Sequence, residues 1–270
     1  MASSKPQDRG PAAPVSPNPL VRKLSHFAPL SEGDRQVLDR LSANDEHFAA
    51  NVDIVGEGQL PRSVFLLKEG VAIRYRALSN GKRQIITFLI PGDLCDIHVF
   101  LLKAMDHSIG TITPVRLASV SRESIMRLFT QHPRISAALW WSSLQEEAML
   151  RERIVALGRR DARGRIAYLL CELLWRYMAV GMANGDTFRL QLTQIELADT
   201  LGLTPVHVNR VLKEFRAQRL ISMEHRVISL LDIGGLQDRA GFNQDYLNFG
   251  GASSEVINYF DHLESERRSG

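Results

Sequence analysis

Residues Thr193–Gln218 read TQIELADTLGLTPVHVNRVLKEFRAQ, and this segment carries the strongest structural signals in the chain. Thr193 and Glu196 have the spacing of a capping box, in which a hydroxyl and a carboxylate satisfy free amides where a helix begins. This first helix is expected to end near Leu201. Gly202 then supplies the backbone freedom that a tight turn needs, and its lack of a side chain lets two helices approach closely.

A second helix is predicted to begin with Thr204 as N-cap and Pro205 as first helical residue. Ala198 is expected where the two helices cross most closely, because only a small side chain fits there. Apolar residues recur at spacings that seal both helices onto a small core: Ile195, Leu197, Ala198, Leu201, Leu203, Val208, Val211, Leu212 and Phe215. Together these features predict a helix-turn-helix, a motif whose second helix enters the DNA major groove.

An ordinary helical hairpin is the alternative interpretation of this segment. The small Ala198, the turn residue Gly202 and the apolar Val208 occupy the helix-turn-helix register together, which favours DNA binding. Arg210 is predicted to be the principal base reader, because arginine matches guanine O6 and N7. The predicted DNA-binding residues are Thr193, Thr204, Pro205, Val206, His207, Asn209, Arg210 and Lys213.

The composition is compatible with this interpretation. The 270 residues suffice for two domains, and 44% hydrophobic residues can build their cores. The net charge of +3 is too small to indicate a partner by itself. Cys95 and Cys171 have neither a zinc spacing nor a disulfide framework. Since no apolar run reaches the ~20 residues of a membrane span and no signal-peptide core is found, a soluble cytoplasmic protein is expected.

The pattern of the chain changes twice before the helix-turn-helix. Residues 1–20 are rich in Pro, Ser and Ala and predict a flexible tail. Two short helices are expected within Val21–Leu41, the second capped by Ser31. Over Phe48–Val120 short apolar runs alternate with glycine turns, and Asn80-Gly81 between two of them is a strong hairpin signal. This region is predicted to be an antiparallel β-domain.

A long helix is predicted over Pro133–Leu157, and it would span more than about 30 Å. It either packs on the β-domain or pairs with its twin in a homodimer. We favour the homodimer, because a helix-turn-helix reader usually needs two half-sites. A further helix is expected within Arg159–Val180, a short strand over Phe188–Leu192, and a β-hairpin wing over Leu220–Leu231. The tail from Gly241 contains one weakly amphipathic stretch.

This order of elements resembles the Crp/Fnr family of bacterial transcription regulators. The resemblance is carried by Glu69-Gly70, the hairpin at Gly81, Pro91-Gly92-Asp93, Gly158-Arg-Arg-Asp161, Arg165-Ile166-Ala167 and Leu192 to Leu220. It implies an α+β fold with an N-terminal antiparallel β-roll of jelly-roll type. The implied division is a disordered tail (1–20), a cyclic-nucleotide-binding-like sensor β-roll (21–131), a dimerisation helix (132–158), a winged helix-turn-helix (159–236) and a C-terminal tail (237–270).

The function implied by the resemblance is that of a transcription regulator. A homodimer would bind double-stranded DNA at an inverted-repeat promoter site, would be controlled through the β-roll, and would contact RNA polymerase if it is an activator. A constitutive DNA-binding role with a vestigial sensor, or an interaction module that uses the β-roll alone, are the alternatives. Activating members often carry a Glu at the place of Val206, so a different base preference is expected there. No GxSxG, Walker, HExxH or dinucleotide motif is present, so an enzyme is not expected.

The effector positions depart from the family pattern. Cyclic-nucleotide-binding members follow Pro-Gly-Asp with a Gly-Glu pair and, further on, an Arg-Ser pair. The corresponding places are Asp96-Ile97 and His107-Ser108, which form the candidate effector pocket. The ribose acceptor is missing, Asp96 adds negative charge beside any phosphate, and His107 is at best a part-time cation. The sequence therefore argues against cyclic AMP as the ligand.

Other sensing chemistries have little support in the sequence. An iron–sulfur cluster needs about four thiolates, which two separate cysteines cannot supply. Cys95, His98 and His107 lie close enough in sequence to ligate haem or a metal, but packed or solvated side chains are the commoner outcome. The sequence thus argues against both cofactors and predicts no metal site, while a redox role for Cys95 stays open. The effector itself is not predicted.

Overall fold

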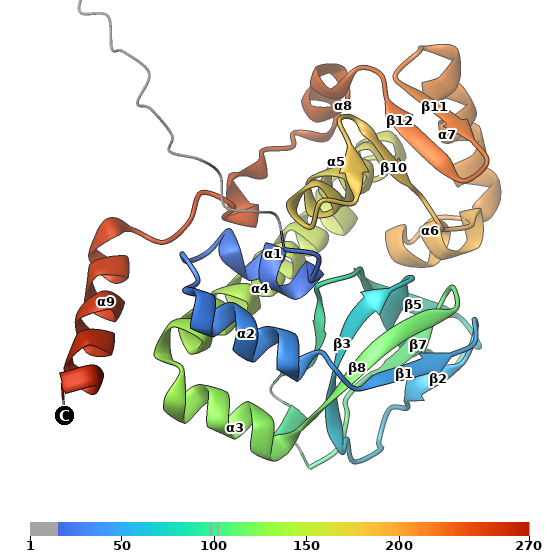
Figure 1. Ribbon diagram of the computed structural model, residues 1–270. Coiled ribbons are helices and arrows are strands. Elements are labelled where there is room, and N and C mark those ends of the chain that lie inside the picture. The colour runs from blue at the N-terminus through green and yellow to red at the C-terminus, as the bar shows by residue number, and fades with distance from the viewer. Residues whose placement is uncertain (1–15, 98, 102, 270) are drawn as a thin grey trace, which may run out of the picture.

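The computed structural model describes residues 16–97, 99–101 and 103–269. A β-domain and a helical C-terminal part lie next to each other, and the long helix α4 (Pro133–Arg159) passes beside the β-domain and continues to the C-terminal part (Figure 1). The predicted long helix is confirmed and extends two residues beyond Leu157. Residues 1–15 and His98 of the sequence-based predictions lie outside the described residues.

The β-domain consists of two four-stranded antiparallel sheets, which confirms the predicted α+β class with an N-terminal β-roll. The first sheet has the order β1-β8-β3-β6, formed by Asp45–Phe48, Val115–Ser121, Ser63–Glu69 and Leu94–Cys95. The second has the order β2-β7-β4-β5, formed by Asp53–Val55, Ser108–Thr111, Ala72–Ala77 and Arg83–Leu89. The clearest apolar runs in this part of the sequence, Val64–Leu67, Val71–Tyr75, Ile85–Leu89 and Val115–Val120, predict strands and correspond to β3, β4, β5 and β8. The other four have only two to four residues, too few for a clear pattern.

The hairpin predicted at Asn80-Gly81 joins β4 to β5. Gly81 has φ +77°, a left-handed conformation that glycine adopts without strain. The Lys82 amide donates to Asn80 Oδ1 at 3.0 Å and closes the turn. The turn fixes the register of the two strands, and this register decides which side chains of β4 face α4.

The structure corrects the predicted N-terminal tail. Residues 1–20 were expected to be flexible, but α1 (Pro19–Ser25) begins inside that range. The Asn18 side chain caps it by accepting from the Leu20 amide at 3.0 Å, and Leu20 is fully buried. Local capping and one anchoring leucine therefore outweigh the polar composition around them. As predicted, Ser31 caps the next helix, α2 (Glu32–Leu41), in a capping box with Asp34.

The C-terminal part is a winged helix-turn-helix built on α5 (Ala162–Ala179). The predicted wing is confirmed, since β11 (Ile221–Glu224) and β12 (Val227–Leu230) form an antiparallel hairpin. These strands continue through β10 (Thr187–Arg189) to β9 (Ala183–Asn184). Apolar residues of α5, α6 (Gln194–Leu201), α7 (Pro205–Ala217) and the wing share one core.

The segment after residue 236 is not the tail that the sequence suggested. Helix α8 (Ile233–Ala240) packs along α5, and both Phe242 and Leu247 beyond it are buried. The Leu247 carbonyl accepts from Gln145 Nε2 of α4, and the Ala252 amide donates to the Phe27 carbonyl at 2.8 Å. Aromatic side chains drive this packing, because they bury large apolar areas on α5. The amphipathic stretch forms α9 (Ser254–Ser269), which extends away from the core (Figure 1).

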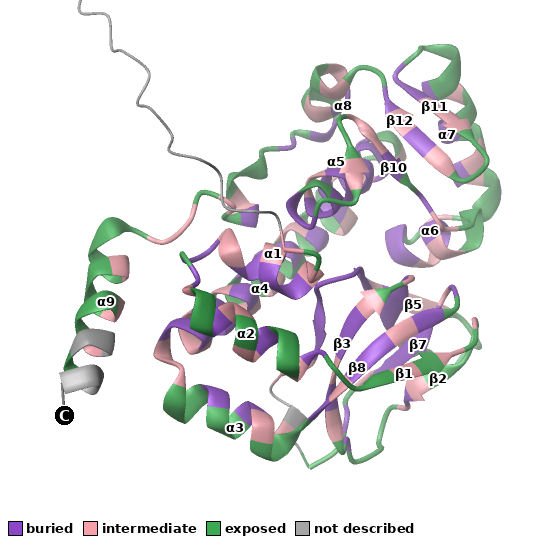
Figure 2. Cartoon of the chain, viewed as in Figure 1, coloured by how far each residue is buried: buried purple, intermediate pink, exposed green. Residues whose placement is uncertain are grey.

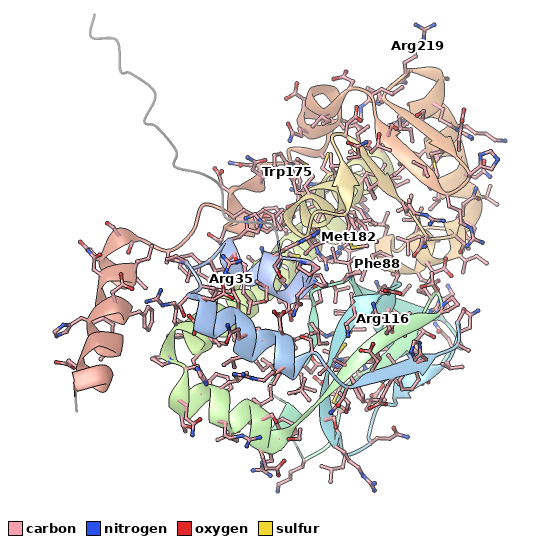
Figure 3. The ribbon with its side chains drawn as sticks, viewed as in Figure 1. Arg35, Phe88, Arg116, Trp175, Met182 and Arg219 are labelled. Atoms are coloured by element: carbon pink, nitrogen blue, oxygen red, sulfur yellow. The ribbon has the colours of Figure 1, made fainter. Side chains whose placement is uncertain are left out.

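A buried ion-pair cluster joins the two parts of the chain. Asp93, in the turn before β6, accepts from Lys23 Nζ of α1 at 2.7 Å and from Arg176 Nη2 of α5 at 2.8 Å. Arg176 also donates to the carbonyl of Phe88, which lies between the β-domain and the C-terminal part (Figure 3). Burial alone would raise the pKa of Asp93, but the two cations lower it below its usual range. Arg83 of β5 adds a contact at 3.0 Å to Asp199 of α6.

Candidate nucleic-acid interface and sensor cavity

The turn between α6 and α7 has the geometry predicted from the sequence. Thr193 and Glu196 form both bonds of the capping box at the start of α6. Gly202 has φ +62° and ψ +38°, the left-handed conformation that ends a helix where glycine is favoured. The Thr204 hydroxyl accepts from the His207 amide at 3.2 Å and caps α7, whose first residue is Pro205. The local sequence thus determines both helix starts and the turn.

The underside of the motif is apolar, and one predicted core residue is misplaced. Ala198 and Val208 are buried as expected, and Leu197, Leu201, Val211, Leu212 and Phe215 join them. Ile195, in the first turn of α6, is instead 57% exposed and does not join this core. The buried and exposed faces of the protein are compared in Figure 2.

The opposite face of the motif is open to solvent. Val206 is 80% exposed, an unusual position for an aliphatic side chain, and Arg210 and Lys213 are exposed beside it. A hollow of about 470 Å³ is lined by Gln194, Pro205, Val206, Asn209, Arg210 and Lys213. Five of the eight predicted DNA-binding residues therefore share one concave surface. Farther along, Arg219 projects from the end of α7 at the outer edge of the molecule (Figure 3).

The other three predicted residues have different places. The hydroxyls of Thr193 and Thr204 are used in the helix caps, although both residues are exposed. His207 is half-buried, and its Nε2 accepts from Arg210 Nη2 at 2.8 Å. Gln194 was not predicted, and it joins the surface from α6, with its Oε1 accepting from Asn209 Nδ2 at 3.0 Å. Its position as the first residue of α6 is the signal that could have revealed it.

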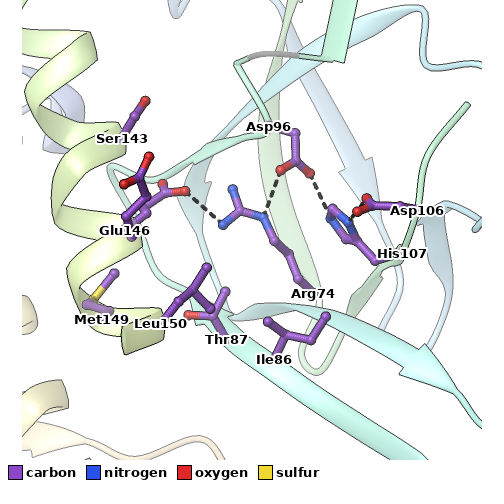
Figure 4. A pocket seen from close by; sticks show the side chains of 11 residues that line it. Arg74, Ile86, Thr87, Asp96, Asp106, His107, Ser143, Glu146, Met149 and Leu150 are labelled. Atoms are coloured by element: carbon purple, nitrogen blue, oxygen red, sulfur yellow. Dashed lines mark hydrogen bonds and ion pairs between the residues drawn. The ribbon is translucent and has the colours of Figure 1, made fainter. Parts of the chain in front are cut away.

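A second cavity, of about 410 Å³, lies between the β-domain and α4. The side chains around it come from β4, β5, the loop that precedes β7, and α4 (Figure 4). Apolar groups of Ile86, Met149 and Leu150 form part of the wall. The polar lining consists of Arg74, Thr87, Asp96, Asp106, His107, Ser143, Glu146 and Glu147. Four carboxylates and one arginine thus line the same cavity.

Arg74 is the centre of this cavity, and only 9% of its side chain is exposed. Its Nε lies 3.2 Å from Asp96, and its Nη1 donates to Glu146 of α4 at 2.9 Å. Its Nη2 donates to the Leu94 carbonyl at 3.1 Å. Burial alone would lower the pKa of Arg74, but Glu146 and Asp96 outweigh it and raise that pKa. The guanidinium is therefore fully charged and already neutralised by the protein (Figure 4).

The chain of charged groups continues to His107. Its Nε2 lies 3.0 Å from Asp96 and its Nδ1 lies 2.7 Å from Asp106. Burial alone would lower the pKa of His107, but its hydrogen bonds to both carboxylates raise it above the ordinary value. Burial likewise opposes ionisation of Asp96, yet Arg74 and His107 hold the pKa of that carboxyl below its usual range. The cavity is thus lined by a continuous network of charges.

Comparison with known proteins identifies both parts of the chain. Residues 45–132 match the cyclic nucleotide-binding domain, and residues 164–239 match the Crp-like helix-turn-helix domain. Together the two matches cover more than half of the chain. The chain belongs to the Crp/Fnr family of transcription regulators.

Several members of the Crp/Fnr family are similar over most of their length. The nitrogen fixation regulation protein FixK of Bradyrhizobium diazoefficiens is 29% identical over 186 residues, which are 69% of this chain and 77% of FixK. The transcriptional activatory protein AadR of Rhodopseudomonas palustris is 26% identical over 213 residues, 78% of this chain and 87% of AadR. The solved structure of FixK2 from Bradyrhizobium japonicum covers 74% of this chain and 98% of FixK2, with TM-score 0.65 and 24% identity. These relatives are regulators, so this Crp/Fnr protein is a transcription regulator and not an enzyme.

Two of the four predicted effector-pocket residues line the cavity, and two do not. Asp96 and His107 line it. Ile97 instead packs against the N-terminal hydrophobic core, and the Ser108 hydroxyl accepts from the Glu57 amide at 2.9 Å. The backbone is left-handed at Asp96, with φ +52°, so the chain turns there, and Asp96 and Ile97 have different surroundings.

The cysteines of this Crp/Fnr protein lie apart and buried. Burial raises the pKa of the Cys95 thiol far above its ordinary value, although Arg74 nearby partly opposes this. Burial also raises the pKa of Cys171 to about 12. Both thiols are therefore protonated at neutral pH, and thiols rather than thiolates react slowly with oxidants. Among the described residues no group of three or more His, Cys, Asp or Glu side chains is arranged to hold a metal ion. None of the described helices is long and apolar enough to cross a membrane.

Proposed function

We propose that this regulator reads promoter DNA with the exposed face of α7. The observation that carries this proposal is the concave surface shared by Val206, Asn209, Arg210 and Lys213. It combines an arginine for guanine, an amide for adenine and a lysine for phosphate with an exposed aliphatic group. No described part of the protein covers Val206, so its exposed methyl groups lack a partner until DNA binds.

Arg210 is the principal base reader in this proposal. Arg210→Ala should weaken binding to the selected site by ~1–3 kcal/mol and relax the preference at one base pair, because a bidentate contact to guanine is lost. The measurement is a binding titration on the selected site and on random DNA, repeated across salt concentrations. An equal loss on both DNAs would assign Arg210 to a phosphate contact, and the salt dependence would then become less steep.

Val206 is proposed to change the base preference relative to family members with a glutamate at this position. Valine cannot accept a hydrogen bond from cytosine N4, but its methyl groups pack on the methyl group of thymine. Selection from random DNA should therefore return a site that differs from that of such members at the corresponding base pair. Recovery of an unchanged site would contradict this assignment.

The proposed active form is a homodimer that pairs through α4. Side chains of α4 that are large, apolar and exposed support it: Trp140, Leu144, Leu150, Ile154 and Val155. Ile154 and Trp140 are 71% and 69% exposed, and large exposed apolar side chains along one helix favour association with a second copy. Two paired chains would present two α7 helices about 34 Å apart, which predicts an inverted-repeat site.

The cavity beside α4 favours control without a cyclic nucleotide. A cyclic phosphate needs an unpaired cation, whereas Arg74 already has two carboxylate partners. Asp106 and Glu147 would add further repulsion. We therefore infer one of two modes of action. Either a signal other than a cyclic nucleotide binds the sensor over residues 21–131 and changes the helix over residues 132–158, or DNA binding is independent of any signal. The internal ion pairs favour the second.

Isolation from the native cytoplasm tests this point. The mass and absorbance of the protein should show no bound nucleotide, and its metal content should be measured alongside them. Added cyclic AMP should leave the affinity for DNA unchanged. A co-purified molecule whose removal abolishes DNA binding would establish an effector and contradict signal-independent action. The cytoplasmic location and a contact with RNA polymerase, if the protein is an activator, belong to the same proposal.

A further inference from the structure

One residue of α6 contacts the proposed base-reading surface without having been predicted. Gln194 is the first residue of α6 and is exposed, so its side chain is not needed for the core. Its Oε1 accepts from Asn209 Nδ2 at 3.0 Å, across the gap between the two helices. Both residues line the same hollow as Arg210. The contact thus connects α6 directly to the middle of α7.

The side-chain amide of Asn209 can bind Gln194 and an adenine base at the same time. An asparagine recognises adenine with two atoms: Oδ1 accepts from adenine N6, and one hydrogen of Nδ2 is donated to adenine N7. Nδ2 carries a second hydrogen, and this hydrogen can remain on Gln194. The amide of Asn209 can therefore keep its bond to Gln194 while it binds an adenine. The bond also orients the amide plane before DNA arrives, which lowers the ordering cost of binding.

The side chain of Arg210, the neighbouring base-reading residue, is also held by a hydrogen bond within the motif. Arg210 Nη2 donates to His207 Nε2 at 2.8 Å, so its guanidinium is also oriented by a residue of the motif. Asn209 is half-buried and lines the hollow, and its shorter side chain has fewer positions available than that of Arg210. Since α6 lies on the adjacent side of the hollow, Gln194 is the residue that can hold it.

From these contacts we infer that Asn209 reads an adenine of the half-site and that Gln194 is the positioning residue that orients its amide. This inference rests on the proposed function, in which α7 reads the DNA. It assigns Gln194 a role in base preference, although the residue lies on α6 and not on the recognition helix.

The test uses the full-length chain and DNA in which one adenine is replaced by 7-deazaadenine. This base lacks N7 and keeps N6, so it removes one of the two contacts to Asn209. The adenine is first located by selection from random DNA with the unchanged protein and with Asn209→Ala. The unchanged protein should lose roughly 3- to 10-fold in affinity on the modified site. Asn209→Ala and Gln194→Ala should each lose less than about 2-fold.

Two further variants separate positioning from other effects. Gln194→Glu retains an oxygen that accepts from Asn209, so it should keep the 7-deazaadenine penalty even though its charge lowers affinity on every DNA. Arg210→Ala should also keep this penalty, because it removes a different contact. Unfolding temperature and affinity for random DNA serve as checks that Gln194→Ala is folded.

The outcomes distinguish this inference from the proposed function. If Asn209→Ala keeps the adenine preference, Asn209 does not read adenine and the inference is wrong. If Gln194→Ala keeps the full 7-deazaadenine penalty, Gln194 does not position Asn209 and the inference is also wrong. If Arg210→Ala, Asn209→Ala and Lys213→Ala all bind the selected site like the unchanged protein, α7 is not the reader and the proposed function fails first.

Discussion

Replacing Arg74 by methionine should destabilise the β-domain strongly. The variant keeps the packing of the aliphatic stem but leaves Asp96 and Glu146 without their shared cation. Removing one partner from a fully buried ion pair costs about 3–5 kcal/mol. The carboxylates of Asp96 and Glu146 remain 20% and 25% exposed, so water compensates part of that cost. We therefore expect a loss of ~2–3 kcal/mol in the free energy of unfolding at neutral pH.

The assay is urea unfolding followed by tryptophan fluorescence, and the midpoint should fall by roughly 1 M. Arg76→Met is the matched control on the same strand, since Arg76 is 55% exposed and its pair with Glu57 should contribute less than ~1 kcal/mol. Because Arg74 lowers the pKa of Asp96 in the folded state, this contribution is present above the ordinary aspartate pKa of 3.8 and is lost as the pH falls through the folded-state pKa. Equal losses in Arg74→Met and Arg76→Met would refute the role assigned to the buried network.

Two other predictions concern α4 and the cavity. Ile154→Glu should yield a monomer in sedimentation and weaken binding to the full inverted repeat. Leu60→Glu changes a similarly exposed side chain outside α4 and should leave the dimer intact. Equal behaviour of the two variants would contradict pairing through α4. Hydrogen bonds to Asp96 and Asp106 raise the pKa of His107 above its ordinary value of 6.5. The stabilisation that protonated His107 provides is therefore full below pH 6.5 and is lost as the pH rises through the folded-state pKa. The urea midpoint of the unchanged protein should therefore exceed that of His107→Gln at about pH 6 and approach it by about pH 8; a constant difference would contradict this.

The sequence alone determined the elements that depend on neighbouring residues. The capping box at Thr193, the left-handed Gly202 and the Thr204-Pro205 helix start each act within a few residues, so their spacing specified the helix-turn-helix. The Asn80-Gly81 turn fixed the β4–β5 hairpin for the same reason. Such signals are readable because the backbone geometry they require is decided locally.

The short strands and the C-terminal segment depended on distant contacts. Strand β6 has only two residues and is held by pairing with β3, so no periodicity could reveal it. The residues after 236 look polar and irregular in sequence, yet Phe242 and Leu247 are buried against helices formed much earlier in the chain. Composition predicts the behaviour of an isolated segment, whereas burial depends on what the rest of the fold provides.

The chemistry of both sites was likewise decided by tertiary structure. Arg74 lies far from Asp96 and Glu146 in sequence, and only the β4 register and the packing of α4 bring each carboxylate within 3.2 Å of the Arg74 guanidinium. Gln194 reaches Asn209 because the turn at Gly202 brings α7 back alongside α6. Charged and amide groups act over a few ångströms in space, whatever their separation along the chain. The sequence therefore determined the helix-turn-helix and the β4–β5 hairpin. The tertiary structure determined which side chains neutralise or orient one another.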